Sequence, residues 1–473
     1  MSMHTQVAVL GGGPGGYAAA FMAADLGLEV TLIEVDARLG GTCLLRGCIP
    51  SKALLHVARV IEETHEMAQW GLEFNSPTVD LGVLRARKDK VIENAANGLK
   101  MLAKQRKVNV IRARGVFADS HTLVLESQAD SGAEVPQLTF DHCILAVGSS
   151  PTVIPAFKLP TDRVMDSTKA LALQEVPDSL LVIGGGYIGL ELGTVYAHLG
   201  SKVTVVELTG GLLPGADRDL VRPLAARLEK LFTSIQLNTK VAGLADKGDA
   251  IEATLEGPEG SSTRRYSRVL VSVGRRPNSK GIGLENTKVK LTEQGFVVTD
   301  EKQQTHDPAI YAIGDISGEP MLAHRASHQG KIAAEAIAGE AAAFDPLAIP
   351  AVVFTDPEIA WAGLTEEQAK REGHTYDVAR YPWAASGRAQ SIGRTEGLTK
   401  ILFDPDTERV LGVGIVGAGA GELIAEGVLA IEMACTARDL AATIHPHPTL
   451  SETISFAAET QLGMATEIYR PKR

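Results

Sequence analysis

Cysteine, long apolar runs and net positive charge are all scarce in this sequence. Only four cysteines occur among 473 residues, which excludes the disulfide-rich scaffold of small secreted proteins. No stretch of about 20 apolar residues is present, so we expect no membrane span. The net charge of −11 disfavours nucleic acids and anionic membrane surfaces as partners. The chain enters a strand-like run almost at once, so we also expect no signal peptide and a cytoplasmic location.

The remaining composition indicates a large multidomain protein. A length of 473 residues predicts two to four domains, and 45% hydrophobic content is enough for sizeable cores. A basic run at residues 85–90 is continued by Lys100, Lys104, Arg106 and Lys107. We interpret this run as the solvated face of a helical hairpin rather than as a nucleic-acid site.

Two of the four cysteines, Cys43 and Cys48, lie in residues 40–52, which read Gly-Gly-Thr-Cys-Leu-Leu-Arg-Gly-Cys-Ile-Pro-Ser-Lys. If this stretch begins a helix, the two sulfurs lie about one turn apart, since a helix has ~3.6 residues per turn. That separation allows a disulfide with slight distortion. A helix N-terminus lowers the pKa of a thiol, and Lys52 lies one turn past Cys48. The pattern predicts a redox-active dithiol in a reducing compartment.

Two other interpretations of the cysteine pair stay open at this point. Both cysteines can be small buried residues, as we expect for Cys143 in an apolar strand-like run and for Cys435 in a helix-like run. A zinc site is the second alternative, because His445 and His447 complete a Cys2His2 set. The residues that flank the cysteines are more specific than the cysteines themselves, so we expect no metal.

A nucleotide-binding pattern precedes the cysteines. An apolar strand at residues 6–10 leads into the glycines Gly11, Gly13 and Gly16, then into a small-residue helix at residues 17–26. A second strand at residues 29–33 ends at Glu34, 23 residues after Gly11. Such glycines permit a tight turn, the approach of a pyrophosphate and close packing of helix on strand, and the acid accepts ribose hydroxyls.

The same unit recurs later in the chain. Residues 180–183 lead into Gly184, Gly186 and Gly189, and a strand at residues 202–206 ends at Glu207, 23 residues after Gly184. The repeat predicts a second dinucleotide site. Glu207 favours NAD, because a carboxylate repels a 2′-phosphate and the two residues that follow supply no arginine.

From about residue 350 we expect three strands, at residues 351–354, 398–403 and 410–416, and two helices. This C-terminal part also contains a candidate base. Residues 445–452 read His-Pro-His-Pro-Thr-Leu-Ser-Glu, and the prolines on both sides of His447 stiffen its backbone. Glu452 can accept a hydrogen bond from one ring nitrogen, which sets the tautomer and raises the basicity of the ring. This pair is a base with a residue that orients it.

Together these motifs resemble the flavoprotein disulfide reductases, and the Ile-Pro-Ser-Lys ending is similar to that of their dihydrolipoamide dehydrogenase branch. The resemblance extends over nearly the whole chain in the right order. It implies an α/β fold with two Rossmann-like dinucleotide-binding domains and a C-terminal α+β interface (dimerisation) domain. The expected segments are an FAD-binding domain at 1–150, an NAD-binding domain at 151–278, a central domain completing the FAD site at 279–348, and the interface domain at 349–473.

The resemblance also implies which residues hold the two cofactors. For FAD these are Gly11, Gly13, Gly16, Glu34, Gly41, Thr42, Lys52, Gly115, Gly148, Ser149, Asp315, Met321, Leu322, Ala323 and His324. For NAD they are Gly184, Gly186, Tyr187, Gly189, Glu191, Glu207 and Gly274. The sequence departs from the family at Leu45-Arg46, which stands between the cysteines in place of Asn-Val. It also departs at Tyr187, which stands where the family often has an aliphatic residue and can cover the nicotinamide pocket. We leave open whether Arg46 lowers a thiol pKa or points to solvent.

The implied activity is the oxidation of protein-bound dihydrolipoamide by NAD+. The implied catalytic residues are Cys43 and Cys48 as the redox disulfide, His447 with Glu452 as the base, and Lys52, which we expect to pair with Glu191 near the flavin. The resemblance further implies a homodimer, in which the histidine comes from the partner subunit. Lipoyl domains and the core subunit of a 2-oxo acid dehydrogenase complex, or a glycine cleavage protein, are the implied partners.

Three other activities compete with this interpretation. A glutathione or mercuric reductase that uses NADPH requires arginines near Glu207 or a C-terminal cysteine pair, and neither is present. A pyridine nucleotide transhydrogenase has no need of the two cysteines. A subunit that only binds a multienzyme core, without turnover, has no need of complete motifs.

Overall fold

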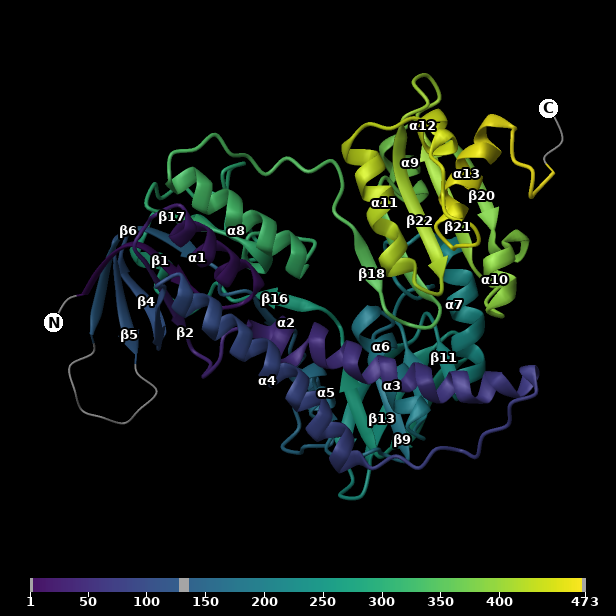
Figure 1. Ribbon diagram of the computed structural model, residues 1–473. Coiled ribbons are helices and arrows are strands. Elements are labelled where there is room, and N and C mark those ends of the chain that lie inside the picture. Colours follow the sequence, from purple (N-terminus) through teal and green to yellow (C-terminus); the bar gives the residue numbers. More distant parts are fainter. Residues whose placement is uncertain (1–2, 127–135, 470–473) are drawn as a thin grey trace.

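The N-terminal sheet carries the first dinucleotide-binding unit. The computed structural model describes residues 3–126 and 136–469 (Figure 1). This sheet has seven strands in the order β3-β2-β1-β6-β5-β4, with β17 paired to β6. All five residues of β2 are buried, as in a parallel strand that is covered on both faces. The strands are β1 (Met3–Leu10), β2 (Val30–Glu34), β3 (Asn109–Arg112), β4 (Arg114–Asp119), β5 (Thr122–Glu126), β6 (Gln137–Leu145) and β17 (Ile310–Ala312).

A segment far along the chain completes this first unit. Strand β17 pairs in parallel with β6, and helix α8 (Ala323–Ile337) lies beside α1 (Pro14–Asp25), as Figure 1 shows. The two helices approach so closely that a Cβ on Gly330 would lie 2.5 Å from the carbonyl oxygen of Gly15. Residues after 300 therefore belong to the packing of the first sheet.

A long helical hairpin extends from the first unit across the second. It consists of α2 (Gly41–Arg46), α3 (Cys48–Glu66), η1 (Met67–Trp70) and α4 (Leu81–Gln105). The basic run at residues 85–90 lies on α4, as predicted, but Lys88 is an exception because its side chain is buried and its Nζ lies 2.7 Å from Asp89. Leu54, Leu55 and Ala58 of α3 enter the core of the second unit.

The second unit is built on a five-stranded parallel sheet, in the order β11-β10-β9-β15-β8. A three-stranded antiparallel sheet, β12-β13-β14, accompanies it, and a two-stranded ribbon of β7 and β16 links it to the first unit. The strands are β7 (Ser149–Pro151), β8 (Val164–Met165), β9 (Ser179–Ile183), β10 (Lys202–Val206), β11 (Ser234–Gln236), β12 (Lys240–Asp246), β13 (Ile251–Gly257), β14 (Gly260–Tyr266), β15 (Arg268–Val271) and β16 (Arg275–Pro277). The helices are α5 (Ser167–Ala172), α6 (Tyr187–His198) and α7 (Arg218–Leu231), with the short turn η2 (Pro155–Phe157). Two further short turns, η3 (Leu284–Asn286) and η4 (Gly314–Ile316), contact β4 and α8 of the first unit.

The C-terminal unit has more elements than the sequence predicted. We expected three strands and two helices after residue 350, and the described residues form a five-stranded antiparallel sheet, β18-β19-β22-β21-β20, with helices around it. The strands that the sequence did not predict are β19, which contains two alanines and a glycine, and the edge strand β20, which begins with aspartate and ends with proline. These residue types are depleted in strands, so both segments give weak β-propensity signals. The elements are β18 (Ala351–Val353), β19 (Glu358–Gly363), α9 (Glu366–Glu372), β20 (Asp377–Pro382), η5 (Trp383–Ala385), α10 (Gly387–Ser391), β21 (Leu398–Phe403), β22 (Val410–Gly417), α11 (Ala420–Glu432), α12 (Ala437–Ala442) and α13 (Glu452–Leu462).

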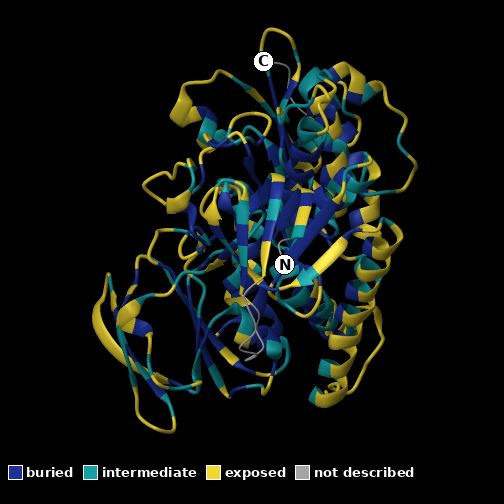
Figure 2. Cartoon of the chain, turned by 90° about the vertical axis from the view of Figure 1, so that its left-hand side faces the viewer, coloured by how far each residue is buried: buried dark blue, intermediate teal, exposed yellow. Residues whose placement is uncertain are grey.

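Burial agrees with this layered arrangement. Most residues of the strands β2, β9, β10, β21 and β22 are buried, and many exposed residues lie in loops and on the outer faces of helices (Figure 2). Cys143 is fully buried in β6, as predicted. Cys435 is only partly buried and lies between α11 and α12 rather than inside a helix. Among the described helices, none is both long and apolar enough to cross a membrane.

Candidate active site

The two predicted redox cysteines lie side by side. Cys43 Sγ is 2.6 Å from Cys48 Sγ, but the helix is not continuous between them, contrary to the simplest form of our expectation. Cys43 lies in α2, Cys48 is the first residue of α3, and Gly47 separates the two helices. A Cβ on Gly47 would lie 2.8 Å from the carbonyl oxygen of Thr42, so only glycine allows this close turn.

The two thiols have opposite electrostatic character. A hydrogen bond from the Cys43 thiol lowers the pKa of Cys48 to about 7, and the charge of Lys52 acts in the same direction against the effect of burial. The same hydrogen bond, together with burial, raises the pKa of Cys43. The reduced pair therefore keeps its proton on Cys43 and its negative charge on Cys48.

Lys52 and Glu191 form the predicted ion pair. Lys52 Nζ lies 2.8 Å from Glu191 Oε2 and joins α3 to α6. The other carboxylate oxygen of Glu191 accepts a hydrogen bond of 3.0 Å from the backbone N–H of Phe354, and Lys52 Nζ also lies 4.4 Å from the centre of the Phe354 ring. The ammonium is therefore fixed one turn after Cys48.

Arg46 follows neither of the two alternatives that the sequence left open. Its guanidinium forms two hydrogen bonds to the carboxylate of Asp36, just after β2. The largest effects on the pKa of Cys43 and Cys48 come from the two thiols themselves, from burial and from Lys52, rather than from Arg46. The residue ties α2 to the end of β2.

The redox pair lies in the wall of a cavity of about 1120 Å³, slightly larger than most small-molecule sites. Tyr187 also lines it, and 41% of this residue is exposed to solvent. Most residues predicted to hold FAD line the same cavity: Gly11, Gly13, Glu34, Gly41, Thr42, Lys52, Gly115, Gly148, Ser149, Asp315, Met321 and Ala323.

Three residues predicted to hold FAD lie outside the cavity wall. Gly16 packs beneath Gly11, where a Cβ would lie 1.8 Å from the Gly11 carbonyl oxygen. Leu322 is the residue that precedes the first turn of α8. His324 donates a hydrogen bond from Nε2 to the carbonyl of Pro350 at 2.8 Å.

The shape of the cavity fits an extended dinucleotide. Helix α1 begins after Gly13 without a side-chain cap, so its first N–H groups are available to a phosphate. Gly13 and Gly41 face each other, and a Cβ on Gly41 would lie 2.6 Å from the Cα of Gly13. Side chains at these two positions would close the passage that a pyrophosphate requires.

The two glycine fingerprints have nearly the same local geometry. Glu34 accepts hydrogen bonds from the N–H of Gly12 at 2.6 Å and of Asp36 at 2.8 Å. Glu207 accepts from Gly185 at 2.6 Å and Thr209 at 2.8 Å. The internal repeat seen in the sequence is therefore also a repeat of side-chain geometry.

The remaining residues predicted for NAD lie around the second fingerprint. Gly184 has a φ of +106°, and a Cβ on Gly189 would lie 2.4 Å from the carbonyl oxygen of Gly184. Gly186 precedes α6, which begins without a side-chain cap. Gly274 has a φ of +104° and accepts a backbone hydrogen bond from Thr152 at 3.0 Å, next to the β7–β16 ribbon.

One contact of this region was missed from the sequence. The hydroxyl of Ser149 donates to Asp315, and it accepts a hydrogen bond of 2.7 Å from Arg275 Nε. The two segments that close the dinucleotide units thus pair with each other through β7 and β16. Their similar sequences were the available signal, but the pairing itself was not predicted.

The predicted base and its orienting residue are in contact. His447 Nδ1 donates to Glu452 Oε1 at 2.8 Å, and Glu452 Oε2 accepts from the N–H of Thr449 at 2.7 Å. The His447 side chain is 78% exposed, whereas that of Glu452 is 11% exposed. Within the described residues Nε2 of His447 has no hydrogen-bond partner, so it is free to accept a proton.

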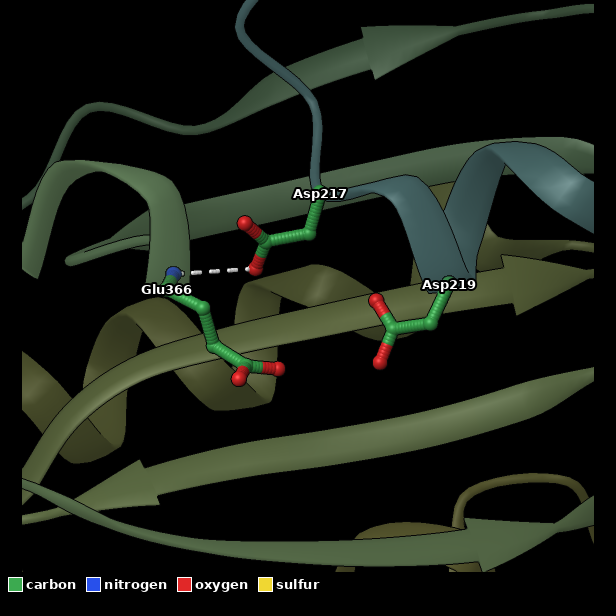
Figure 3. Close-up of side chains that lie close together, drawn as sticks. All are labelled: Asp217, Asp219 and Glu366. Atoms are coloured by element: carbon green, nitrogen blue, oxygen red, sulfur yellow. Dashed lines mark hydrogen bonds between the residues drawn. The ribbon is translucent and has the colours of Figure 1, made fainter. Parts of the chain in front are cut away.

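Within the described part of a single chain, the residues of the zinc alternative do not lie together. There, the one group of three or more potential ligands is Asp217, Asp219 and Glu366 (Figure 3), so the cysteines and histidines do not converge. The ammonium of Lys400 contacts all three carboxylates, at 2.5, 2.7 and 2.9 Å. This acidic cluster, which sequence reasoning missed, therefore already holds a cation of the chain itself and joins α7 to the C-terminal sheet.

Comparisons with known proteins agree with this geometry. Residues 5–330 match the family described as pyridine nucleotide-disulphide oxidoreductase, and residues 349–458 match the dimerisation domain of these proteins. A dihydrolipoyl dehydrogenase of Haemophilus influenzae is 49% identical over 99% of this chain and 98% of its own length. One from Vibrio parahaemolyticus is 47% identical with the same coverage.

Solved structures share the fold over nearly the full length. LpdA from Mycobacterium tuberculosis superimposes with a TM-score of 0.89 at 28% identity, covering 97% of this chain and 99% of its own. The HOCl-induced flavoprotein disulfide reductase RclA from Escherichia coli gives a TM-score of 0.84 at 27% identity, with 96% and 99% coverage. The chain therefore belongs to the pyridine nucleotide-disulphide oxidoreductase family.

Proposed function

We propose that this chain is a dihydrolipoyl dehydrogenase, which oxidises protein-bound dihydrolipoamide to lipoamide and reduces NAD+ to NADH. The observation that carries the proposal is the cysteine pair in the wall of the dinucleotide cavity, with the more acidic thiol at Cys48. Relatives with this name that are 41–49% identical over nearly the whole chain support the choice of substrate.

The thiol exchange assigns a role to each residue of the pair. In the proposed homodimer, His447 of the second copy, oriented by Glu452, takes the proton of one dihydrolipoyl thiol at Nε2. The thiolate attacks Cys43 Sγ, the Cys43–Cys48 bond breaks, and Cys48 leaves as a thiolate. The second substrate thiol then attacks the substrate sulfur of the mixed disulfide and closes the lipoamide ring. Cys43 is released and carries a proton, which agrees with its raised pKa.

The residues of the cavity determine how electrons leave the pair. Glu191 holds the ammonium of Lys52 close to Cys48, and the charge of Lys52 stabilises the Cys48 thiolate against the opposing charge of Glu191. The fingerprint at Gly11, with Glu34, would hold FAD along the cavity. When bound, FAD supplies a two-electron acceptor for the thiolate and a hydride donor for NAD+.

The second fingerprint supports NAD rather than NADP as the final acceptor. Glu207 is buried and accepts two backbone hydrogen bonds that fix its carboxylate. A 2′-phosphate would approach this negative charge, and the next residue, Leu208, offers no compensating cation. We therefore assign Gly184, Gly186, Gly189 and Glu207 to NAD.

We further propose a homodimer that serves a multienzyme complex. Leu429 and Met433 lie four positions apart, about one helical turn, and both are exposed. Ile444 is also exposed. Such an apolar surface favours contact with a second copy, and the match to a dimerisation domain supports the same assembly. Lipoyl domains and the core subunit of a 2-oxo acid dehydrogenase complex, or a glycine cleavage protein, are the proposed partners. The cytoplasmic location and the domain boundaries at 150, 278 and 348 stay predictions.

One set of assays on the purified holoenzyme tests the proposal. NAD+ reduction by dihydrolipoamide is compared with NADPH oxidation by glutathione disulfide and by Hg(II), under the same conditions. We expect the first activity to exceed the other two by several orders of magnitude. A preference for glutathione disulfide or Hg(II) would show that the chain is another reductase of the family.

A further inference from the structure

The chain contains two histidine–glutamate pairs in one short segment, and they differ in a systematic way. In the pair of the proposed base, the histidine is exposed and the glutamate is buried. In the second pair, His445 Nε2 lies 2.7 Å from Glu426 Oε1, and here the histidine is buried, with 8% of its side chain exposed. The second pair is therefore not another base that faces solvent.

Both ring nitrogens of His445 are already engaged. Nδ1 lies 2.9 Å from the carbonyl oxygen of Thr443, and a carbonyl can only accept, so Nδ1 carries a proton. Nε2 is bound to Glu426. The ring has no free nitrogen with which to accept a substrate proton, and its role must differ from that of His447.

The connectivity of the segment indicates what this role is. Residues 443–451 connect α12 to α13, and most of their hydrogen bonds join members of the segment to one another or to the adjoining turns of those helices. Glu452, the first residue of α13, holds the segment at its C-terminal side through His447 and Thr449. Among the hydrogen bonds and ion pairs of the described residues, the bond from His445 to Glu426 is the one that ties positions 444–448 to an element other than α12 and α13, namely α11.

We propose that His445 and Glu426 are positioning residues for the base, and this inference rests on the proposed function. The bond to α11 fixes the N-terminal side of the His447 position, while Glu452 fixes the C-terminal side. Pro446 and Pro448 restrict the backbone between these two points. With the α11 bond removed, the imidazole of His447 still has its orienting acid but no longer has a fixed location.

The expected effect is a partial loss of one reaction step. A displacement of about 1 Å in a catalytic group can cost about a hundredfold in rate. We expect Glu426→Ala and His445→Ala to slow reduction of the holoenzyme by dihydrolipoamide by about ten- to a hundredfold. Glu426→Gln, which keeps an acceptor oxygen, should recover most of the rate. Electron transfer from NADH to a dye needs no substrate deprotonation and should not change.

A double-mutant cycle separates positioning from independent action. If His445 acts through His447, then His445→Ala should cost nothing further in a His447→Gln background. The matched control is His374→Gln in the same C-terminal unit, where His374 forms an exposed pair with Glu372 at 3.4 Å. An equal loss from His445→Ala in both backgrounds would overturn the proposal.

Hydrogen exchange gives a readout that does not depend on the activity. The amides of Ile444, His445, His447 and Thr449 should exchange faster in the Glu426→Ala holoenzyme than in the wild type, and the His374→Gln protein should match the wild type. Unchanged exchange in the Glu426→Ala protein would also overturn the proposal. A wild-type protein that fails to oxidise dihydrolipoamide would instead count against the proposed function, and the exchange result would still report on the bond to α11.

Discussion

The buried cluster around Lys400 gives a prediction whose size can be worked out from the structure. Lys400 is 1% exposed, and its ammonium contacts the carboxylates of Asp217, Asp219 and Glu366. Lys400→Met keeps most of the side-chain volume and removes the charge, so three acids lose their shared cation. Removing one partner of a buried ion pair typically costs about 3–5 kcal/mol, because a charge is left buried and uncompensated.

Two features of the cluster place the expected loss at the lower end of that range. Arg380 remains in contact with Asp219 and Glu366. Asp217 also keeps two hydrogen bonds of 3.1 Å from the N–H groups of Glu366 and Glu367. We therefore expect Lys400→Met to lower the free energy of unfolding by about 3 kcal/mol.

The pH dependence of this loss has a definite sign. Hydrogen bonds from Lys400 and Arg380 outweigh burial and lower the pKa of the Asp219 carboxyl in the folded protein. This contribution to stability is present above the unfolded pKa of about 3.9 and is lost as the pH falls through the lower folded value. Without Lys400 the folded pKa of Asp219 rises, so mild acid neutralises the repelling carboxylates. The deficit of Lys400→Met should therefore be smaller at pH 5 than at pH 8.

The matched control is a lysine that uses the same acid. Lys370 lies 3.9 Å from Glu366 but is 68% exposed, and exposed pairs contribute only about 0–1 kcal/mol. Urea unfolding of the holoenzyme, followed by circular dichroism, compares Lys400→Met with Lys370→Met. If the two variants had equal midpoints, the ammonium of Lys400 would not be the cation that stabilises this cluster.

Three further predictions concern the proposed reaction. Because Glu207 closes the second fingerprint, kcat/KM should be much larger for NAD+ than for NADP+, and equal values would contradict this assignment. Cys43→Ser and Cys48→Ser should each abolish dihydrolipoamide oxidation with FAD retained, and only Cys43→Ser should show a long-wavelength charge-transfer band. In the wild-type enzyme reduced by two electrons, the same band should grow as the pH rises through about 7, because the pKa of Cys48 is lowered to about that value. The band in Cys48→Ser alone would reverse the two roles. His447→Gln should slow flavin reduction by dihydrolipoamide at least a hundredfold in stopped flow and spare NADH-driven dye reduction; an unchanged fast phase would exclude His447 as the base.

The sequence predicted those parts of the site that depend on short-range patterns. The glycine turns, the acids at the strand ends and the His447–Glu452 pair are each set within a few residues, or within a unit of known spacing, so their positions follow from the chain itself. The Lys52–Glu191 pair is an exception, because its partners are 139 residues apart. It was expected only from the family resemblance.

The parts that could not be predicted arise from contacts between units. Lys400 stands in a strand that is apolar apart from Thr399, and a buried lysine gives no hint of which acids will surround it. The two glutamates that fix the imidazoles also differ in this respect. Glu452 lies five residues from His447, but Glu426 lies 19 residues from His445 on another helix. Only the first pair is visible as a local motif.

The arrangement of charge around the cysteines explains why the two thiols are not interchangeable. They lie 2.6 Å apart, but they occupy different helices and have different neighbours. Cys48 begins α3, where the helix dipole and Lys52 both favour a thiolate, and Cys43 donates a hydrogen bond to that thiolate. A substrate thiolate that attacks Cys43 thus displaces the better leaving group, since a thiol with a lower pKa leaves faster. The direction of electron flow from substrate to Cys43 and then to Cys48 is built into the break between α2 and α3 at Gly47.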